Sequence, residues 1–262
     1  MSIKQTLGKL WPWKNQAHEI CRLRDEHGTV SLYEHGAFRT LVFDDSFYEQ
    51  GRVHKHDPLH LEHEYIRAML LPVLSRQAPE RITIFGLGAG SLARWLHHYV
   101  PLSQLTAVEL RASVIRIARE YLQLPHDERL QVLNQPAAVY IESAAPRSTD
   151  WILCDLYHAF QSDDTQASRD FYRNCRRVLT NDGWLVVNHN KLPVRAFPPL
   201  KFLCEQFEAV FTLNIDSSNW ILFATPANIT RNEILALPAP AWLPATLADD
   251  LSKFRQRLVK VV

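Results

Sequence analysis

The sequence predicts an α/β protein with a mostly parallel sheet, an antiparallel hairpin at the C-terminal end of that sheet, and a small N-terminal β domain. Three observations support this fold class. Strand and helix patterns alternate between residues 81 and 188, a glycine-rich turn follows the first of those strands, and two later apolar runs are joined only by Asp216-Ser-Ser. Such alternation is typical of parallel strands covered by helices, whereas so short a connection requires antiparallel strands.

The first part of the chain has the spacing of β-hairpins. Short alternating runs lie over 29–33 and 39–43, and the turn residues Gly28 and Gly36 stand beside them. We therefore expect a small β domain within residues 1–58.

Longer apolar periods predict a second domain over residues 59–226. It begins with a helix whose apolar residues run from Leu59 to Val73 and which ends near Pro79. The elements that follow alternate: strand 81–86, helix 90–99, strand 105–109, helix 111–123, strand 130–134, helix 136–143, strand 151–155, helix 167–179 and strand 183–188. The last expected elements are helix 196–207, the hairpin runs 209–215 and 219–224, and, within a C-terminal extension over 227–262, a helix at 245–260.

Composition argues against several classes of protein. Lys and Arg number 29 and Asp and Glu 28, so the formal charge of +1 provides no general attraction for nucleic acid. Lysines and Pro12 interrupt the N-terminal segment before a signal-peptide core can form, and no stretch approaches the roughly 20 apolar residues of a membrane span. The four cysteines lack metal-type spacing. We expect a cytoplasmic protein with reduced thiols and with neither nucleic-acid nor membrane partners.

The run Gly86-Leu-Gly-Ala-Gly90 lies between a predicted strand and a predicted helix. Glycines allow a sharp turn there and let a ligand approach the backbone where a Cβ would obstruct it. Glu109 closes the next strand, and a carboxylate in that place can accept both hydrogen bonds of a ribose 2′,3′-diol. The alternative is a tight turn without a ligand. Together the turn and Glu109 favour a nucleoside site that includes Gly86, Gly88, Ala89 and Gly90.

Two further strand ends carry polar side chains. Asp155 ends an apolar strand at the sheet edge where open α/β sheets bind ligands; it could orient or deprotonate an attacking amine, or simply cap the next turn. His158 could act as a base near neutral pH, beside Tyr157, or be an ordinary polar residue. Gln135 follows strand 130–134, where its amide could hydrogen-bond an adenine or face solvent.

Four histidines between His54 and His63 could supply metal ligands, and His60 would share a helix face with Glu64. No second half of a ligand set occurs elsewhere in the sequence. We therefore predict no metal site and interpret the segment as a polar helix start that lines a cleft.

These residues together resemble the spermidine synthase (polyamine aminopropyltransferase) family of the class I S-adenosylmethionine-dependent transferase fold, in particular its bacterial spermidine-synthase-like members. The spacing Gly-x-Gly-x-Gly, with Val108-Glu109 after it, is similar to the pattern of that fold. The resemblance covers about residues 28–225 and includes segments 39–44, 49–51, 63–65, 171–184 and 219–224.

The resemblance implies a Rossmann-like sheet of the methyltransferase type, a small N-terminal β domain and a homodimer. It also implies transfer of an aminopropyl group from decarboxylated S-adenosylmethionine to an amine, without a metal. Gln50, the Gly86–Gly90 loop, Glu109 and Gln135 would line the nucleoside, and Asp155 would lie between donor and acceptor.

The sequence departs from the family's pattern inside this site. Ala89 replaces the aspartate of Gly-Gly-Gly-Asp-Gly, which holds the donor's ammonium, and Asp155-Leu-Tyr-His158 lacks the second carboxylate of Asp-x-x-Asp. Gln135 replaces an acid that faces adenine, and Glu62 replaces the tyrosine before His-Glu.

Each lost carboxylate removes an attraction for a polycation of about 1–3 kcal/mol. We therefore expect a transferase that binds S-adenosylmethionine or its decarboxylated form and alkylates a small acceptor, with an amine such as a polyamine as the first candidate and with spermidine synthesis itself doubtful. Two alternatives stay open. One is a true polyamine aminopropyltransferase with a modified diamine site, and the other is a catalytically degenerate homologue that serves as a nucleoside-binding or scaffold module.

Overall fold

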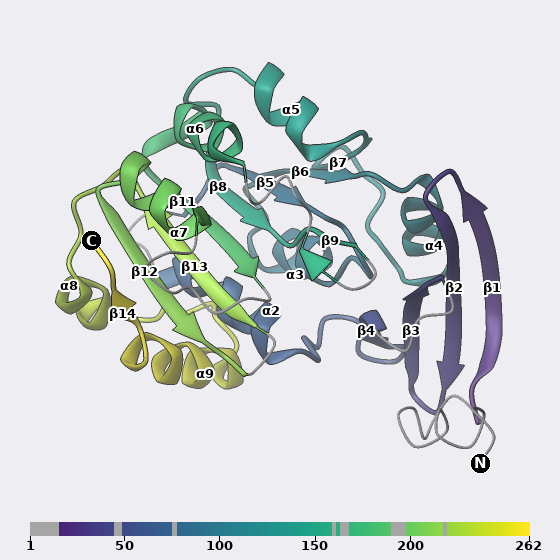
Figure 1. Cartoon of the computed structure of the whole chain (residues 1–262). Coiled ribbons are helices and arrows are strands. Elements are labelled where there is room, and N and C mark those ends of the chain that lie inside the picture. Colours follow the sequence, from purple (N-terminus) through teal and green to yellow (C-terminus); the bar gives the residue numbers. More distant parts are fainter. Residues whose placement is uncertain are drawn as a thin grey trace, which may run out of the picture.

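The computed structural model describes residues 16–44, 49–74, 78–158, 161–162, 168–189, 198–216 and 219–262, with the backbone alone at 157–158 and 161–162. A four-stranded and an eight-stranded sheet organise these residues, beside a two-stranded ribbon of β9 (Tyr157–His158) and β10 (Gln161–Ser162). The predicted α/β class with an N-terminal β segment is confirmed (Figure 1).

The N-terminal sheet is antiparallel, in the order β1-β2-β3-β4. Its strands are β1 (His18–Asp25), β2 (Gly28–His35), β3 (Phe38–Phe43) and β4 (Glu49–His54). Strand β4 contains a bulge, because Leu41 pairs with Gly51 while Val42 pairs with Glu49, which leaves Gln50 as an extra residue. A bulge bends its strand and redirects a side chain.

The central sheet has the order β14-β12-β13-β11-β8-β5-β6-β7. Five of its strands are parallel: β5 (Arg81–Phe85), β6 (Gln104–Glu109), β7 (Leu130–Asn134), β8 (Thr149–Cys154) and β11 (Leu179–His189). The antiparallel members are β12 (Ala209–Asn214), β13 (Trp220–Thr225) and β14 (Val259–Lys260). The expected C-terminal hairpin, β12–β13, is therefore confirmed.

Helices cover both faces of the central sheet (Figure 1). The helices on the first face are α2 (Glu64–Met69), α3 (Ser91–Tyr99), α4 (Ala112–Tyr121) and α9 (Ala245–Gln256). Those on the second are α5 (Ala137–Ser143), α6 (Arg169–Val178) and α7 (Pro198–Gln206). The side chains of β8 alternate between the two, since Trp151 and Leu153 join the first core while Ile152 and Cys154 join the second. Helix α4 also contacts β1 and β2, so it lies between the two sheets (Figure 1).

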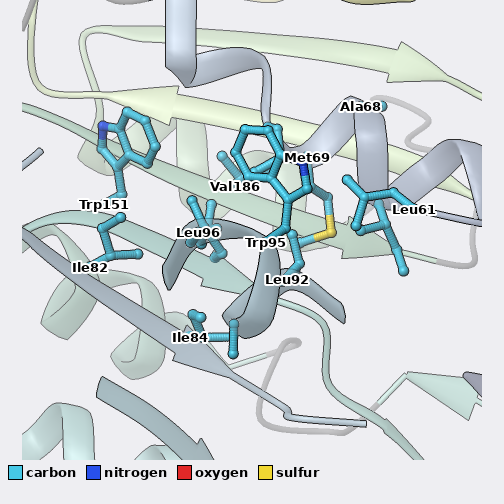
Figure 2. Packing of buried hydrophobic residues seen from close by; sticks show 14 of the residues in the cluster. Leu61, Ala68, Met69, Ile82, Ile84, Leu92, Trp95, Leu96, Trp151 and Val186 are labelled. Atoms are coloured by element: carbon cyan, nitrogen blue, oxygen red, sulfur yellow. The ribbon is translucent and has the colours of Figure 1, made fainter. Parts of the chain in front are cut away.

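The first core fixes the strand and helix on either side of the glycine turn. Figure 2 shows Ile84 of β5 near Leu92 and Leu96 of α3, with Trp95 beside Met69 of α2. Ile84, Leu96 and Met69 are at most 1% exposed. Burial of each such side chain contributes roughly 1.5–3 kcal/mol, which holds β5 and α3 as rigid supports for the turn between them.

Several elements differ from the sequence-based expectation. The helix expected from Leu59 to Pro79 is only α2, followed by a 3₁₀ turn at Leu71–Leu74, because Pro72 lacks an amide hydrogen and disfavours helical geometry at the residue before it. In the C-terminal extension the helix expected over 245–260 ends at Gln256, and Val259–Lys260 instead form β14 of the central sheet; two residues carry too little pattern to be predicted as a strand. A short helix, α8 (Arg231–Ala236), was not expected. The domain boundaries at residues 58 and 226 stay predictions. Within the described ranges, no helix has the length and apolar character needed to cross a membrane.

Candidate functional site

The glycine turn joins β5 to α3 with a backbone that only glycine adopts easily. Gly86, Gly88 and Gly90 have φ angles of 84°, 51° and 75°, and Gly90 is the N-cap of α3. A Cβ on Gly86 would lie 2.3 Å from the carbonyl oxygen of Asp155. The turn therefore runs directly against the end of β8, where the sequence placed its candidate catalytic carboxylate.

The bulge of β4 lies on the other side of this turn. A Cβ on Gly88 would be 3.2 Å from the carbonyl oxygen of Gln50, and one on Gly51 would be 2.7 Å from the Cβ of Ala89. Ala89 is accordingly only 4% exposed. The sequence-predicted residues Gln50, Gly88 and Ala89 thus come together, but the methyl group of Ala89 is covered by the β4 backbone, so a larger side chain there would need space from Gly51.

Glu109 ends β6 and is bound to the same turn. Its Oε2 accepts a hydrogen bond from the Leu87 amide at 2.8 Å, and its Oε1 accepts one from the Arg111 amide at 2.9 Å. Burial raises the pKa of Glu109, and the amides of Arg111, Leu87 and Gly88 act in the opposite direction. Because a carboxylate has about four acceptor sites, these amides leave capacity for an external donor such as a hydroxyl.

Gln135 lies beside Glu109, as the order of the sheet requires. Its backbone amide donates to the Glu109 carbonyl oxygen at 3.2 Å, and its side chain is partly exposed. The side-chain amide of Asn134 donates to the same carbonyl at 3.0 Å. The backbone at the end of β7 is therefore held against β6, and contact of the Gln135 side chain with an adenine stays a prediction.

Asp155 follows β8 and has two polar side chains around it. Its Oδ1 accepts a hydrogen bond from Asn188 Nδ2 at 2.9 Å, and its carboxylate also accepts one from the hydroxyl of Tyr65. Burial raises the pKa of Asp155 to about 6, and both hydrogen bonds oppose that shift. At neutral pH the group is mostly ionised, so it can attract an ammonium or accept a proton from an amine.

Asn188 and Tyr65 are the site residues that sequence reasoning missed. Asn188 lies on β11 beside β8, is 1% exposed, and its Oδ1 has no hydrogen-bond partner among the described residues. A buried acceptor without a partner costs about 1–3 kcal/mol, which a ligand N–H would recover. The available signal was that Asn188 ends the strand expected at 183–188, but its place next to Asp155 depends on the sheet order.

The remaining candidate residues are Tyr157, His158 and the histidine-rich segment between His54 and His63. Tyr157 and His158 form β9, and their side chains lie outside the described part of the structure. From the histidine-rich segment, His63 stacks on Tyr65 with ring centroids 5.6 Å apart, and its Nε2 lies 3.4 Å from Glu49 Oε1. Burial lowers the pKa of His63, which favours its neutral form. Among the described residues, no three His, Cys, Asp or Glu side chains gather as a metal-binding group.

Arg94 of α3 makes hydrogen bonds to the glycine turn and to two neighbouring segments. Its guanidinium donates to the carbonyl oxygens of Pro58 at 2.8 Å, Leu122 at 2.8 Å and Ala89 at 3.2 Å. Burial lowers the pKa of Arg94 to about 10, so the group stays charged at neutral pH. One buried cation thus joins the turn to the end of α4 and to the segment before α2.

A cavity of about 620 Å³ lies elsewhere, at the edge where β5 and β8 begin. Trp151, Trp184 and Phe223 contribute to its wall, and none of the predicted site residues does. The candidate site is therefore defined by the convergence of the glycine turn, Glu109 and Asp155 at the opposite, carboxyl edge, as open α/β sheets favour.

Comparison with known proteins adds independent information. A family model described as the spermine/spermidine synthase domain matches residues 59–220. A polyamine aminopropyltransferase of Neisseria meningitidis serogroup A is 35% identical over 161 residues, which cover 61% of this chain and 60% of that protein. One of Chromobacterium violaceum is 32% identical over 160 residues, again 61% of this chain and 60% of the relative. The match thus spans less than two thirds of the length of these curated relatives.

Solved structures share the fold. A probable spermidine synthase from Corynebacterium glutamicum has a TM-score of 0.73 at 22% identity, covering 82% of this chain and 85% of that one. The spermidine synthase of Thermotoga maritima has a TM-score of 0.64 at 15% identity, with 90% and 88% covered. Because the family model also matches more than half of the chain, the protein belongs to the spermine/spermidine synthase family.

Proposed function

We propose that this protein is an aminopropyltransferase that takes the aminopropyl group from decarboxylated S-adenosylmethionine and transfers it to an amine, through an acceptor site modified at His158. The observation that carries the proposal is Asp155, whose backbone carbonyl lies against the glycine turn and whose ionisable carboxylate is held by Tyr65 and Asn188. The names of the relatives point to the same reaction.

In the proposed reaction the lone pair of a neutral amine attacks the aminopropyl carbon next to the sulfonium. A C–N bond forms, the C–S bond breaks, its electron pair stays on sulfur, and methylthioadenosine leaves. The acceptor nitrogen arrives as an ammonium and must lose a proton before attack, and Asp155 attracts this ammonium and accepts the proton. The free Oδ1 of Asn188 fits a second N–H of the same amine, and Tyr65 orients the carboxylate.

The acceptor class follows from the carboxylates that remain. Because His158 stands where the family has a second acid, we propose an acceptor that presents one ammonium near Asp155 and a neutral or weakly charged group near His158. The test is to incubate the protein with decarboxylated S-adenosylmethionine and a series of amines (propylamine, 1,3-diaminopropane, putrescine, cadaverine and spermidine) and to measure methylthioadenosine.

We expect amine-dependent release that Asp155→Asn abolishes and that the exposed control Asp127→Asn, whose carboxylate pairs with His97, leaves intact. Absence of methylthioadenosine with every amine, or full activity of Asp155→Asn, would contradict the proposal.

A second candidate function, a reaction that uses intact S-adenosylmethionine as the donor, is favoured only by Ala89. A neutral residue there no longer attracts the donor's ammonium and no longer repels the carboxylate of intact S-adenosylmethionine. Calorimetry with both donors separates the two functions. Comparable affinity of the unaltered protein for both donors supports binding of intact S-adenosylmethionine. Strong preference of the unaltered protein for the decarboxylated donor would exclude this second candidate.

A further inference from the structure

A buried ion pair joins the N-terminal sheet to the turn that follows β6. Arg111 Nη2 lies 3.0 Å from Asp25 Oδ1 and Arg111 Nε lies 3.2 Å from Asp25 Oδ2, with side chains only 8% and 13% exposed. The hydroxyl of Ser113 donates to the same carboxylate, and the guanidinium carbon lies 4.5 Å from the ring centroid of Phe43. These contacts lower the pKa of Asp25 against the effect of its burial.

The backbone of Arg111 makes a separate hydrogen bond, to the side chain of Glu109. Arg111 is the N-cap of α4, in an extended conformation, and its amide donates to Glu109 Oε1 at 2.9 Å. Its side chain is thus fixed by β1 while its main chain fixes the carboxylate that ends β6. Any movement of the guanidinium that rotates this backbone also moves the hydrogen bond that orients Glu109.

We infer that Asp25 and Arg111 are a positioning pair, which holds the Glu109 carboxylate in the orientation that binds ribose hydroxyls and so couples the N-terminal sheet to nucleoside affinity. The inference rests on the proposed function, because it requires that Glu109 binds the ribose. Neither residue needs to touch the nucleoside for this coupling. A purely packing role for the pair would weaken all ligands alike, whereas a positioning role weakens the contact with the diol in particular.

The experiment compares two probes, 5′-methylthioadenosine and its 2′-deoxy analogue, by calorimetry. The unaltered protein is expected to prefer the ribonucleoside, and Glu109→Gln is expected to remove most of that preference. Asp25→Asn should weaken binding of methylthioadenosine roughly tenfold and binding of the deoxy analogue much less. The matched control is Glu19→Gln, which breaks an ion pair with Arg22 on the same strand and should leave both affinities unchanged.

Arg111→Gln and the double variant Asp25→Asn/Arg111→Gln complete a double-mutant cycle. If the pair acts as a unit, the double variant loses no more ribose preference than either single variant does. Should Asp25→Asn fail to fold, Arg111→Lys, which keeps the charge but loses the two-point contact, provides the same comparison. Equal losses for both probes, or no loss, would overturn the positioning role while Glu109 still binds the ribose. Failure of the unaltered protein to bind either probe would instead contradict the proposed function.

Discussion

Asp155→Asn separates stability from activity at the candidate site. Burial raises the pKa of Asp155 from 3.8 to about 6, so the folded protein binds this proton more tightly than the unfolded chain does. The free energy of unfolding therefore falls as pH rises from about 4 to about 6, and the loss persists at neutral pH. A shift of about two pKa units corresponds to about 3 kcal/mol, and water access to this partly exposed residue reduces the expected value to about 1–3 kcal/mol.

The oxygen of the new side-chain amide can still accept the hydrogen bond from Asn188, and its nitrogen can donate to the hydroxyl oxygen of Tyr65. Both neighbours therefore keep a hydrogen-bond partner. We expect Asp155→Asn to be inactive yet more stable than the unaltered protein at pH 7.5, with the difference shrinking toward pH 4. Urea denaturation at several pH values measures this directly. A variant that is less stable by the same amount at every pH would refute the assignment of a carboxylate that is buried yet ionised at neutral pH.

Three further predictions follow from the same contacts. Gly86→Ala should lose at least about 2 kcal/mol of stability, because it combines a left-handed backbone with a Cβ placed 2.3 Å from the Asp155 carbonyl oxygen; a loss below about 1 kcal/mol in urea would contradict that geometry. Arg94→Met should cost about 2–4 kcal/mol, since the carbonyls of Pro58, Ala89 and Leu122 lose their donor; thermal unfolding at unchanged temperature would show that water replaces it. Finally, kcat/KM should fall about tenfold per unit as pH drops below about 6, where Asp155 becomes protonated, and a profile that is flat from pH 7 to 5 would argue against Asp155 as the ionised group.

The strands and the turn that carry the candidate site could be predicted from the sequence. The sequence predicts the turn at Gly86–Gly90 and the strand ends at Glu109 and Asp155 because both signals are local. A left-handed turn requires glycine at particular positions, and a buried strand requires a run of apolar residues. The homodimer and the nucleoside contacts stay predictions.

Sequence reasoning could not supply the contacts between distant segments. The bonds from Tyr65 and Asn188 to Asp155 and the pairing of Asp25 with Arg111 join strands and helices whose proximity depends on sheet order. Nor does the one-letter pattern reveal that Gln50 occupies a bulge, since a bulge is a property of register between two strands.

The most direct test of the central claim is a crystal structure of the protein with methylthioadenosine. We expect the ribose hydroxyls to lie within hydrogen-bond distance of Glu109, the glycine turn to contact the nucleoside, and the sulfur to face Asp155. A nucleoside bound elsewhere, or bound at the turn with its ribose away from Glu109 and its sulfur away from Asp155, would contradict it.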